Sequence, residues 1–243
     1  MIEDGAPLGA RGPLAPSGGW RTARVLEIDR PVPQGVRVRL EVADRIDHMP
    51  GQHYVVRLTA PDGYTAQRSY SIASPPSDPQ VELFVEQLED GEVSGYLADV
   101  AEPGDEFEVR GPIGGWFVWD GDMPALLVGG GTGVVPLVAM LRTARDLGRT
   151  DLLRLAVAAR AWRELPYAEE LADAGALIAL SRERRGIRPP GRLGGDEIVP
   201  LWEPGQTAYV CGSPSFAESL SQLLLQLGFA AADVRIERFG PSG

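Results

Sequence analysis

The chain has 243 residues, of which 23 are basic and 34 acidic, so its formal net charge is −11. This acidic balance argues against general nucleic-acid binding, which requires a basic face. One cysteine, Cys211, and two histidines, His48 and His53, exclude an intramolecular disulfide and leave too few ligands for a zinc site or an iron–sulfur cluster. No apolar run approaches the roughly 20 residues of a membrane span, and no secretion signal opens the chain. The sequence therefore predicts a soluble, cytoplasmic protein without a metal site.

Residues 1–19 are rich in glycine, proline and alanine and lack an apolar period, which predicts a flexible arm. From 20 to 121, short runs of alternating apolar and polar residues are separated by turn sequences such as Pro50-Gly51 and Asp90-Gly91. Strands are expected at 24–28, 36–42, 54–58, 69–73, 81–88 and 106–109. Strands this short and this closely spaced predict a small antiparallel barrel or sandwich.

The pattern changes after Gly121, where strands begin to alternate with helices. Strands are expected at 125–128, 153–159, 177–180, 207–211 and 234–239, and helices at 134–147, 167–174 and 215–227. This alternation is typical of a doubly wound parallel sheet. The sequence therefore predicts two domains, an antiparallel β domain over 20–121 and an α/β domain over 122–243.

A glycine-rich loop, Gly129–Pro136, stands directly between the first predicted strand of the α/β domain and its helix. Glycines there let a backbone approach a pyrophosphate closely, and the helix N-terminus offers free N–H groups and the positive end of a dipole. The loop lacks the third glycine of G-x-G-x-x-G, because Val134 takes that place, and it is not a P-loop, because no Gly-Lys-Ser/Thr follows. A plain tight turn is the alternative, but the loop's place at the carboxyl end of a parallel strand favours a ligand site.

Two further segments carry polar or reactive groups. Arg68-Ser69-Tyr70-Ser71 in the first domain is either an ordinary surface strand or a site with a phosphate-binding arginine, an aromatic face for a flat ring and a hydroxyl near the ring edge. Cys211, followed by Gly212 and a helix start, ends another parallel strand. A lone buried cysteine is usually a small apolar residue, but its position suggests a second ligand-facing loop.

Taken together, these segments resemble the ferredoxin–NADP reductase family of flavoproteins, in the form without a fused iron–sulfur domain. The resemblance covers residues 20–239 and rests on motifs in the family's order: Pro50-Gly51-Gln52, Arg68-Ser69-Tyr70-Ser71-Ile72-Ala73-Ser74, Gly91-Glu92-Val93-Ser94, Arg110-Gly111-Pro112-Ile113-Gly114, Gly129–Pro136, Cys211-Gly212 and Glu237-Arg238-Phe239. It implies an N-terminal β-barrel that binds FAD and a C-terminal domain that binds a nicotinamide dinucleotide.

The resemblance also implies roles for individual residues in FAD binding. Arg68 would contact the FAD pyrophosphate, Tyr70 would stack on the isoalloxazine, and Ser71 would hydrogen-bond near flavin N5, the atom that accepts hydride. The turn at Val93 and Ser94 would hold phosphate with its N–H groups. The remaining residues expected near the flavin are Ser69, Ser74, Val85, Glu86 and Phe239, the last of which would shield one flavin face.

For the second domain, the resemblance implies that Gly130, Gly131, Thr132 and Gly133, with Pro136, cradle the dinucleotide pyrophosphate, and that Cys211 and Gly212 approach the nicotinamide. Ser71 and Glu237 would form the proton path, and Cys211 would shape the pocket, which makes these three the expected catalytic residues. Four residues follow Phe239, whereas some family members end at that aromatic.

The choice between NADPH and NADH depends on the loop after the third α/β strand, where the family places its adenosine ribose contacts. Ser181 and Arg182 supply the hydroxyl and the cation that a 2′-phosphate requires, and Arg160 is a candidate second contact. Glu183 argues the other way, because a carboxylate suits a ribose hydroxyl. The sequence favours NADPH, with NADH as the less favoured alternative.

The resemblance implies hydride transfer from the nicotinamide to FAD and onward electron transfer. With one cysteine, the chain is expected to deliver electrons to a separate protein, which would be a ferredoxin, an oxygenase, or a haem or molybdenum protein. Two alternatives stay open: a reductase of free flavin or ferric iron, and a non-catalytic electron-transfer subunit of a larger complex. The expected oligomeric state is a monomer or weak dimer.

Overall fold

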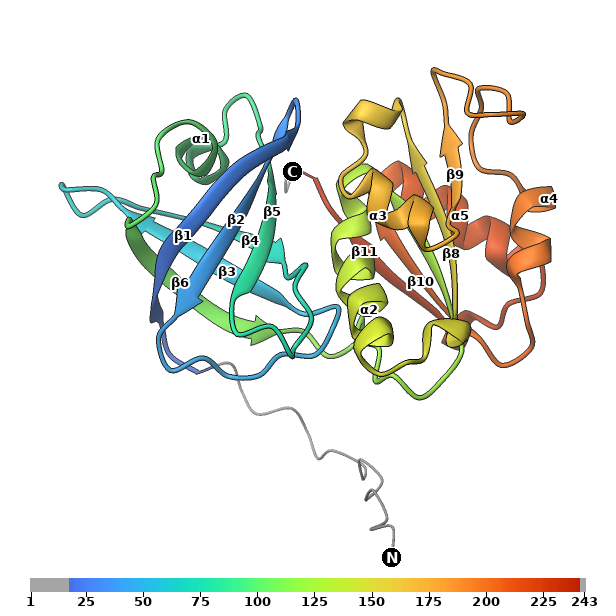
Figure 1. The fold of residues 1–243 in the computed structure, drawn as a ribbon, viewed down its shortest axis with the longest axis horizontal. Coiled ribbons are helices and arrows are strands. Elements are labelled where there is room, and N and C mark those ends of the chain that lie inside the picture. Colours follow the sequence, from blue (N-terminus) through green and yellow to red (C-terminus); the bar gives the residue numbers. More distant parts are fainter. Residues whose placement is uncertain (1–17, 241–243) are drawn as a thin grey trace, which may run out of the picture.

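The computed structural model describes residues 18–240, which form two domains side by side (Figure 1). The expected flexible arm falls almost entirely outside the described residues, as do 241–243. Each domain has its own sheet: the first is antiparallel with six strands, and the second is parallel with five. The predicted fold class, a β-barrel followed by an α/β domain, is confirmed.

The first domain is an antiparallel barrel with one helix. Its elements are β1 (Arg21–Val32), β2 (Gly35–Val42), β3 (His53–Thr59), β4 (Thr65–Ser71), β5 (Val81–Glu86), α1 (Glu92–Asp99) and β6 (Glu106–Ile113). The strands are ordered β4-β3-β6-β1-β2-β5, and a bridge between Ile72 and Leu83 joins the last strand to the first. The alternation that marks β2 in the sequence has its expected physical cause, because Val36, Val38 and Leu40 point into the barrel core.

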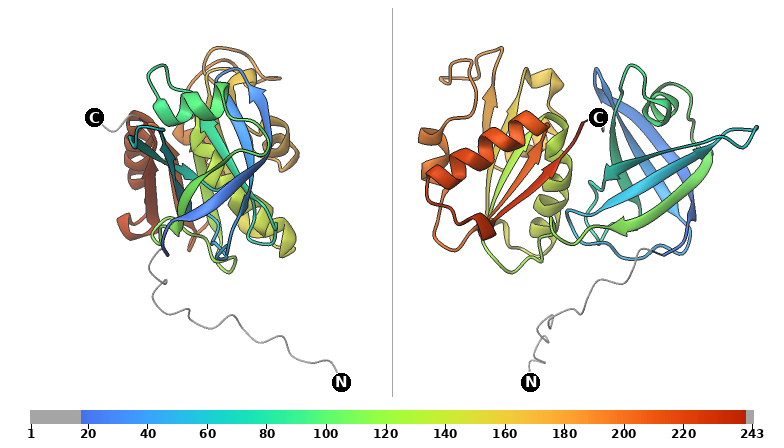
Figure 2. Two further views of the ribbon diagram at one scale, coloured as in Figure 1. Left: turned by 90° about the vertical axis from the view of Figure 1, so that its left-hand side faces the viewer. Right: turned by 180° about the vertical axis from the view of Figure 1, so that it is seen from behind.

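The second domain is a doubly wound sheet. Its elements are β7 (Ala125–Gly130), α2 (Val135–Asp146), β8 (Leu153–Ala159), α3 (Ala168–Asp173), β9 (Leu177–Leu180), α4 (Gly195–Ile198), β10 (Thr207–Gly212), α5 (Pro214–Gln226) and β11 (Val234–Arg238). The strands are parallel in the order β11-β10-β7-β8-β9. Leu127 of β7 packs with α2 and α3 on one face, and Leu126 packs with α4 and α5 on the other. In the right-hand view of Figure 2, which is seen from behind, the orange-red helix α5 lies in front of the sheet.

Two helices were not expected from the sequence. The segment at Val93 and Ser94, predicted as a turn, is the first turn of α1, so that expectation was wrong. The four-residue helix α4 lies in a stretch without a predicted element. Among residues 18–240, no helix is both long enough and apolar enough to cross a membrane.

Candidate functional site

A cavity of about 840 Å³ lies between the two domains. The β1–β2 turn and the end of β5 line it on the barrel side, and the glycine-rich loop and the carboxyl ends of β8, β9 and β10 line it on the other. Parallel strands of this order place ligands at their carboxyl ends, where the strand order reverses. The cavity therefore occupies the position that the sheet topology predicts for a dinucleotide.

The glycines of the glycine-rich loop meet different structural requirements at different positions. Gly131 has a left-handed backbone, with φ of +56°, and faces open space. A β-carbon on Gly133 would lie 2.3 Å from the backbone oxygen of Cys211, so only glycine lets the loop pack against β10. A β-carbon on Gly130 or Gly212 would collide with the ring of Phe216. Close packing therefore explains Gly130, Gly133 and Gly212, whereas Gly131 is explained by its left-handed backbone.

The loop continues through a 3-10 turn, Gly131–Val134, into α2, where Pro136 is buried in the first helical turn. Thr132 donates its hydroxyl hydrogen to the carboxylate of Glu86 on the barrel, at 2.8 Å. Both Thr132 and Glu86 line the cavity. This hydrogen bond tethers the expected phosphate-binding loop to the opposite domain.

The lining of the cavity is basic although the chain as a whole is acidic. Its lining includes two glutamates and four arginines, and the arginines are Arg160, Arg163, Arg182 and Arg192. Within the part of the chain that the structure describes, none of the four guanidinium groups makes an ion pair or a hydrogen bond to another residue. Ser181 lines the same cavity. This grouping is suited to a phosphate ester.

Sequence reasoning found Arg160, Ser181 and Arg182 but missed Arg163 and Arg192. Arg192 reaches the cavity because the loop after β9 folds back, with the Gly191 N–H donating to the Leu180 carbonyl at 2.9 Å. No local pattern in the sequence signals that return.

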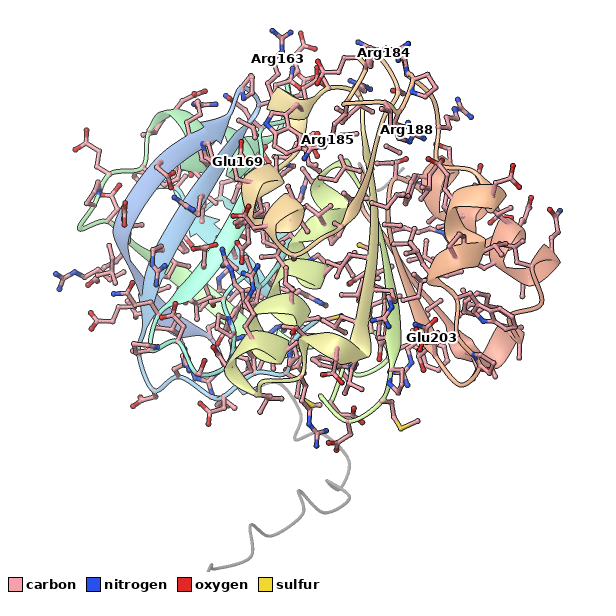
Figure 3. All side chains as sticks on the ribbon, turned by 45° about the vertical axis from the view of Figure 1, so that its right-hand side comes forward. Arg163, Glu169, Arg184, Arg185, Arg188 and Glu203 are labelled. Carbon is pink, nitrogen blue, oxygen red and sulfur yellow. The ribbon has the colours of Figure 1, made fainter. Side chains whose placement is uncertain are left out.

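Glu183, the residue that argued for NADH, does not line the cavity. Its carboxylate accepts a hydrogen bond from the backbone N–H of Trp162. Figure 3 shows Arg163 and Arg184 at the same end of the α/β domain, with Glu203 at the opposite end. The arginine-rich loop therefore belongs to the ligand-binding end of the sheet.

On the barrel side, Arg68 and Tyr70 share one face of β4, and Ser69 and Ser71 share the other, as a strand requires. The exposed Arg68 guanidinium donates to the Gln67 carbonyl at 2.7 Å and has no carboxylate partner in residues 18–240. Tyr70 is half-buried, and burial raises the pKa of its hydroxyl. These residues do not line the cavity, but the bridge after β4 places the strand end beside β5, whose Phe84 and Glu86 do.

The start of α1 has free backbone N–H groups of the kind that the predicted phosphate contact requires. The eight-residue helix has no side-chain cap within the described residues, so the N–H groups of its first turn, at Glu92, Val93 and Ser94, have no helical partner. The helix lies against β4 and β5. The Val93 side chain packs in the barrel core, so only its backbone N–H group is available for the predicted phosphate contact. The same contact is predicted for the backbone N–H group of Ser94.

Two residues expected at the flavin have side chains that are engaged inside the barrel. The hydroxyl of Ser74, fully buried, accepts a hydrogen bond from the N–H of Glu82 at 3.0 Å. The Val85 side chain is buried in the barrel core. Neither residue lines the cavity.

The end of the sheet brings Cys211, Glu237 and Phe239 together. Cys211 pairs with Glu237 across β10 and β11, and the Phe239 N–H donates to the Gly212 carbonyl at 2.9 Å. Burial, with the Glu237 charge nearby, raises the pKa of the Cys211 thiol, which therefore stays protonated. Burial also raises the pKa of Glu237 from 4.5 to about 7. The group at this position is a neutral thiol beside a carboxylic acid that can hold a proton near neutrality.

The residues present fit a flavin dinucleotide. Among residues 18–240, five buried side-chain atoms have no hydrogen-bond partner, namely His48 Nδ1, Tyr54 Oη, Ser71 Oγ, Arg110 Nε and Glu237 Oε2. Buried polar groups are rarely left unpaired, and a bound ligand with a polar ring edge would supply partners for the Ser71 hydroxyl and Glu237 Oε2. Arg68 and the first turn of α1 supply cationic and N–H contacts for a pyrophosphate. The donor set therefore matches the chemistry of a phosphate-linked cofactor with a polar ring edge.

Comparison with known proteins agrees with this interpretation. The family model of the oxidoreductase FAD-binding domain matches residues 34–118. The chain is 30% identical, over 244 aligned positions, to the reductase subunit of an aromatic O-demethylase from Amycolatopsis sp., with 91% of this chain and 70% of that protein covered. It is 29% identical over 217 residues to the ferredoxin–NAD(P)(+) reductase component of the naphthalene 1,2-dioxygenase/salicylate 5-hydroxylase systems of Ralstonia sp., with 85% of this chain and 65% of that protein covered.

Among solved structures, the cytochrome P450 reductase of Amycolatopsis superposes with a TM-score of 0.78 at 27% identity, covering 93% of this chain and 71% of that one. The chain thus spans about two thirds of the length of these relatives, 65% and 70% for the two sequences compared above. The match extends over both domains and includes the FAD-binding barrel. The chain belongs to the ferredoxin–NADP reductase family of FAD-dependent oxidoreductases.

Proposed function

We propose that this protein is an NADPH-dependent reductase that passes electrons from its FAD to a separate redox protein of an oxygenase system. FAD and a nicotinamide dinucleotide follow from family membership. The preference for NADPH, the roles of individual residues and the class of partner are the parts proposed. The observation that carries the proposal is the group of unpaired arginines around Ser181 in a cavity that faces the barrel.

The proposed roles on the barrel side follow from the groups available there. When bound, FAD supplies the redox chemistry, because it accepts two electrons as hydride and can release them one at a time. Arg68 and the first-turn N–H groups of α1 would bind the pyrophosphate, and the face of Tyr70 would pack on the flavin ring. The unpaired Ser71 hydroxyl would donate to a ring nitrogen, and this removes the cost of leaving it buried without a partner.

At the end of the parallel sheet, Glu237 would hold a proton near neutral pH and exchange it close to the reacting ring atoms. Phe239 lines the cavity and would cover the flavin face until the nicotinamide takes its place. Cys211 would act through its shape, since a protonated, fully buried thiol is not a nucleophile.

The preference for NADPH is supported by charge. Ser181, Arg182 and Arg160 would contact the 2′-phosphate, with Arg163 and Arg192 within the same basic lining. The carboxylate that would favour a ribose 2′-hydroxyl, Glu183, is bonded to a backbone N–H outside the cavity.

The test compares kcat/KM for NADPH and NADH in the wild type, in Arg182→Ala and in Arg184→Ala. Arg184 is on the same loop but does not line the cavity, so it is the matched control. A charge-assisted contact is worth about 1.5–3 kcal/mol, so Arg182→Ala should lower kcat/KM for NADPH by roughly 10- to 100-fold and leave that for NADH almost unchanged. Equal losses with both nucleotides, or a wild type that prefers NADH, would refute the NADPH proposal.

The proposal of a protein partner is supported by the cysteine content and by the relatives. The single cysteine is buried, so these 243 residues cannot hold an iron–sulfur cluster, and electrons must pass to a centre outside this segment. The relatives described above are reductase components of oxygenase and demethylase systems. We also propose a cytoplasmic location, where a free thiol stays reduced and NADPH is available.

Turnover with a panel of purified ferredoxins and oxygenase components, compared with ferricyanide and free FMN, tests the partner. At least one protein acceptor should saturate at micromolar concentration with a rate above that of the small acceptors. Faster, saturable reduction of free flavin or ferric chelates across the whole panel would instead make the protein a small-molecule reductase.

A further inference from the structure

Strand β5 contacts both domains, one with each of its faces. Val81, Leu83 and Val85 point into the barrel core. The alternate residues Glu82, Phe84 and Glu86 contact residues of the α/β domain. A strand at the edge of a barrel normally has an outer face in water, yet Glu82 is 2% exposed and Phe84 is 4% exposed. The outer face of β5 is therefore a docking face for the second domain.

The carboxylate of Glu82 divides its two oxygens between the domains. Oε2 accepts a hydrogen bond from Arg39 of the barrel at 3.3 Å. Oε1 accepts one from Arg142 of α2 at 2.8 Å and one from the hydroxyl of Tyr167 at 3.0 Å, both in the α/β domain. A buried carboxylate is expensive unless its oxygens are satisfied, so this arrangement penalises any relative displacement of the domains.

Arg142 is held from both sides. Its guanidinium also pairs with Glu170 at 2.8 Å within its own domain, and it donates to the Ala73 carbonyl of the barrel at 3.1 Å. Burial alone lowers the pKa of this side chain, but the bonds and charges of Glu170 and Glu82 raise it above the ordinary value, so Arg142 stays charged.

Tyr167 supplies an independent observation. It has a left-handed backbone, with φ of 57°, at the start of α3, a conformation that is rare for an aromatic residue. Its ring packs against Phe84 with centroids 5.9 Å apart, and the Arg142 guanidinium carbon lies 5.0 Å from the ring centroid. Such a conformation persists only where the surroundings impose it, and the Tyr167 side chain is held here by Phe84, Arg142 and Glu82.

The same face of β5 borders the cavity. Phe84, which packs on Tyr167, lines it, and so does Glu86, two residues further along the strand. The docking contacts and the ligand site are thus parts of one rigid strand. Buried ion pairs add little net stability compared with apolar packing, but they are directional. A directional contact at this place is suited to fixing geometry.

We propose that Glu82, held by Arg142 and Tyr167, is a positioning residue that fixes how the nicotinamide-binding domain sits on the FAD domain and thereby sets the rate of hydride transfer between them. The inference rests on the proposed function only in that NADPH or NADH is oxidised on one domain while FAD is reduced on the other. Glu82 touches neither reacting ring in this role; it acts through the relative placement of the domains.

The experiment uses the FAD-loaded protein and four variants: Glu82→Gln, Tyr167→Phe, the double variant, and Tyr96→Phe as control. Tyr96 donates its hydroxyl to Asp105 at 3.2 Å inside the barrel domain, so it controls for the loss of a tyrosine hydroxyl. Stopped-flow absorbance measures the limiting rate of flavin reduction and the apparent Kd for NADPH. Reduction by dithionite, which does not require alignment of the domains, is measured alongside.

Since small misplacements of reacting atoms reduce rates steeply, Glu82→Gln should lower the limiting rate by about tenfold or more, with the apparent Kd and the dithionite rate changed less than about twofold. Tyr167→Phe should lower the rate by about threefold, and the double variant should be no slower than Glu82→Gln, because the two residues act as a unit. Tyr96→Phe should match the wild type.

Hydrogen–deuterium exchange provides a readout independent of turnover. In Glu82→Gln and Tyr167→Phe, amides of Val81–Glu86 and Ala168–Asp173 should exchange faster, while β7 and β10 should be unchanged. Limiting rates and exchange that match the wild type would overturn the proposal, and if Glu82→Gln does not fold, Tyr167→Phe decides alone. If neither nucleotide reduces the wild-type flavin, the proposed function fails, and the exchange data still decide the inference about Glu82.

Discussion

Replacing Glu237 with glutamine tests the electrostatics of the site most directly. Glu237 is half-buried beside Cys211 at the end of the parallel sheet, and its buried Oε2 has no hydrogen-bond partner in residues 18–240. Burial raises its pKa from 4.5 to about 7. Glutamine has nearly the same shape as glutamate and cannot ionise, so Glu237→Gln removes the ionisable group and changes little else.

The direction in which the unfolding free energy changes with pH follows from proton linkage. The folded state holds the Glu237 proton up to about pH 7, whereas the unfolded chain releases it near pH 4.5. The stabilising effect of the raised pKa is therefore fully present below pH 4.5 and is lost as the pH rises through 7. A pKa raised from 4.5 to about 7 corresponds to roughly 3 kcal/mol. Between pH 4.5 and 8, the wild type should lose roughly 3 kcal/mol of unfolding free energy relative to Glu237→Gln.

The assay is urea unfolding followed by circular dichroism at half-unit pH intervals from 4.5 to 8, with FAD saturating throughout. Glu41→Gln, which removes an exposed carboxylate from β2, is the control and should follow the wild type at every pH. Parallel curves for the wild type and Glu237→Gln would refute the reasoning, because they would mean that Glu237 titrates alike in the folded and unfolded chains.

Three further substitutions test other parts of the structure. Gly133→Ala should destabilise the protein by about 1–3 kcal/mol in urea unfolding, because its β-carbon would lie 2.3 Å from the Cys211 backbone oxygen; a fully stable variant would contradict this packing. Glu86→Gln should tighten NADPH binding severalfold in a fluorescence titration, because it removes a negative charge from the cavity lining while the glutamine oxygen can still accept the Thr132 hydrogen bond; weaker binding would contradict this electrostatic effect. Trp119→Ala should cost about 3–5 kcal/mol in the same unfolding assay, because the ring is 1% exposed and donates to a backbone carbonyl; a loss under about 1 kcal/mol would contradict its place in the core.

Much of the fold could be predicted because local periodicity reports burial. In β2, alternation follows from one face packing into the barrel, and in β7, a continuous apolar run follows from helices on both faces. Helix α1 was missed because its eight residues are too few to establish a period. It is stabilised by packing Val93 and Leu97 on the barrel rather than by its own sequence.

The candidate site likewise contains residues that could be located from the sequence and residues that could not. The glycine-rich loop could be located from its sequence, because a chain turn at the end of a buried strand requires glycine wherever it takes a left-handed backbone or packs closely. Arg192 could not be found, because only the return of the loop after β9 brings it beside Ser181. Ser74 lies within the motif that resembles the family's, but its hydroxyl is used inside the barrel.

The sequence by itself determined the class of each domain, the place of the glycine-rich loop and the absence of cysteine ligands for a cluster within these residues, since each follows from residue type and local spacing. Only the tertiary structure decided which glycines serve packing, which arginines share the cavity and why Glu82 is buried. Glu82 reads in the sequence as the polar residue of an alternating strand, with its side chain in water. It is instead bonded to Arg142 and Tyr167, 60 and 85 residues away, because the second domain docks on that face, and no local pattern encodes such a contact.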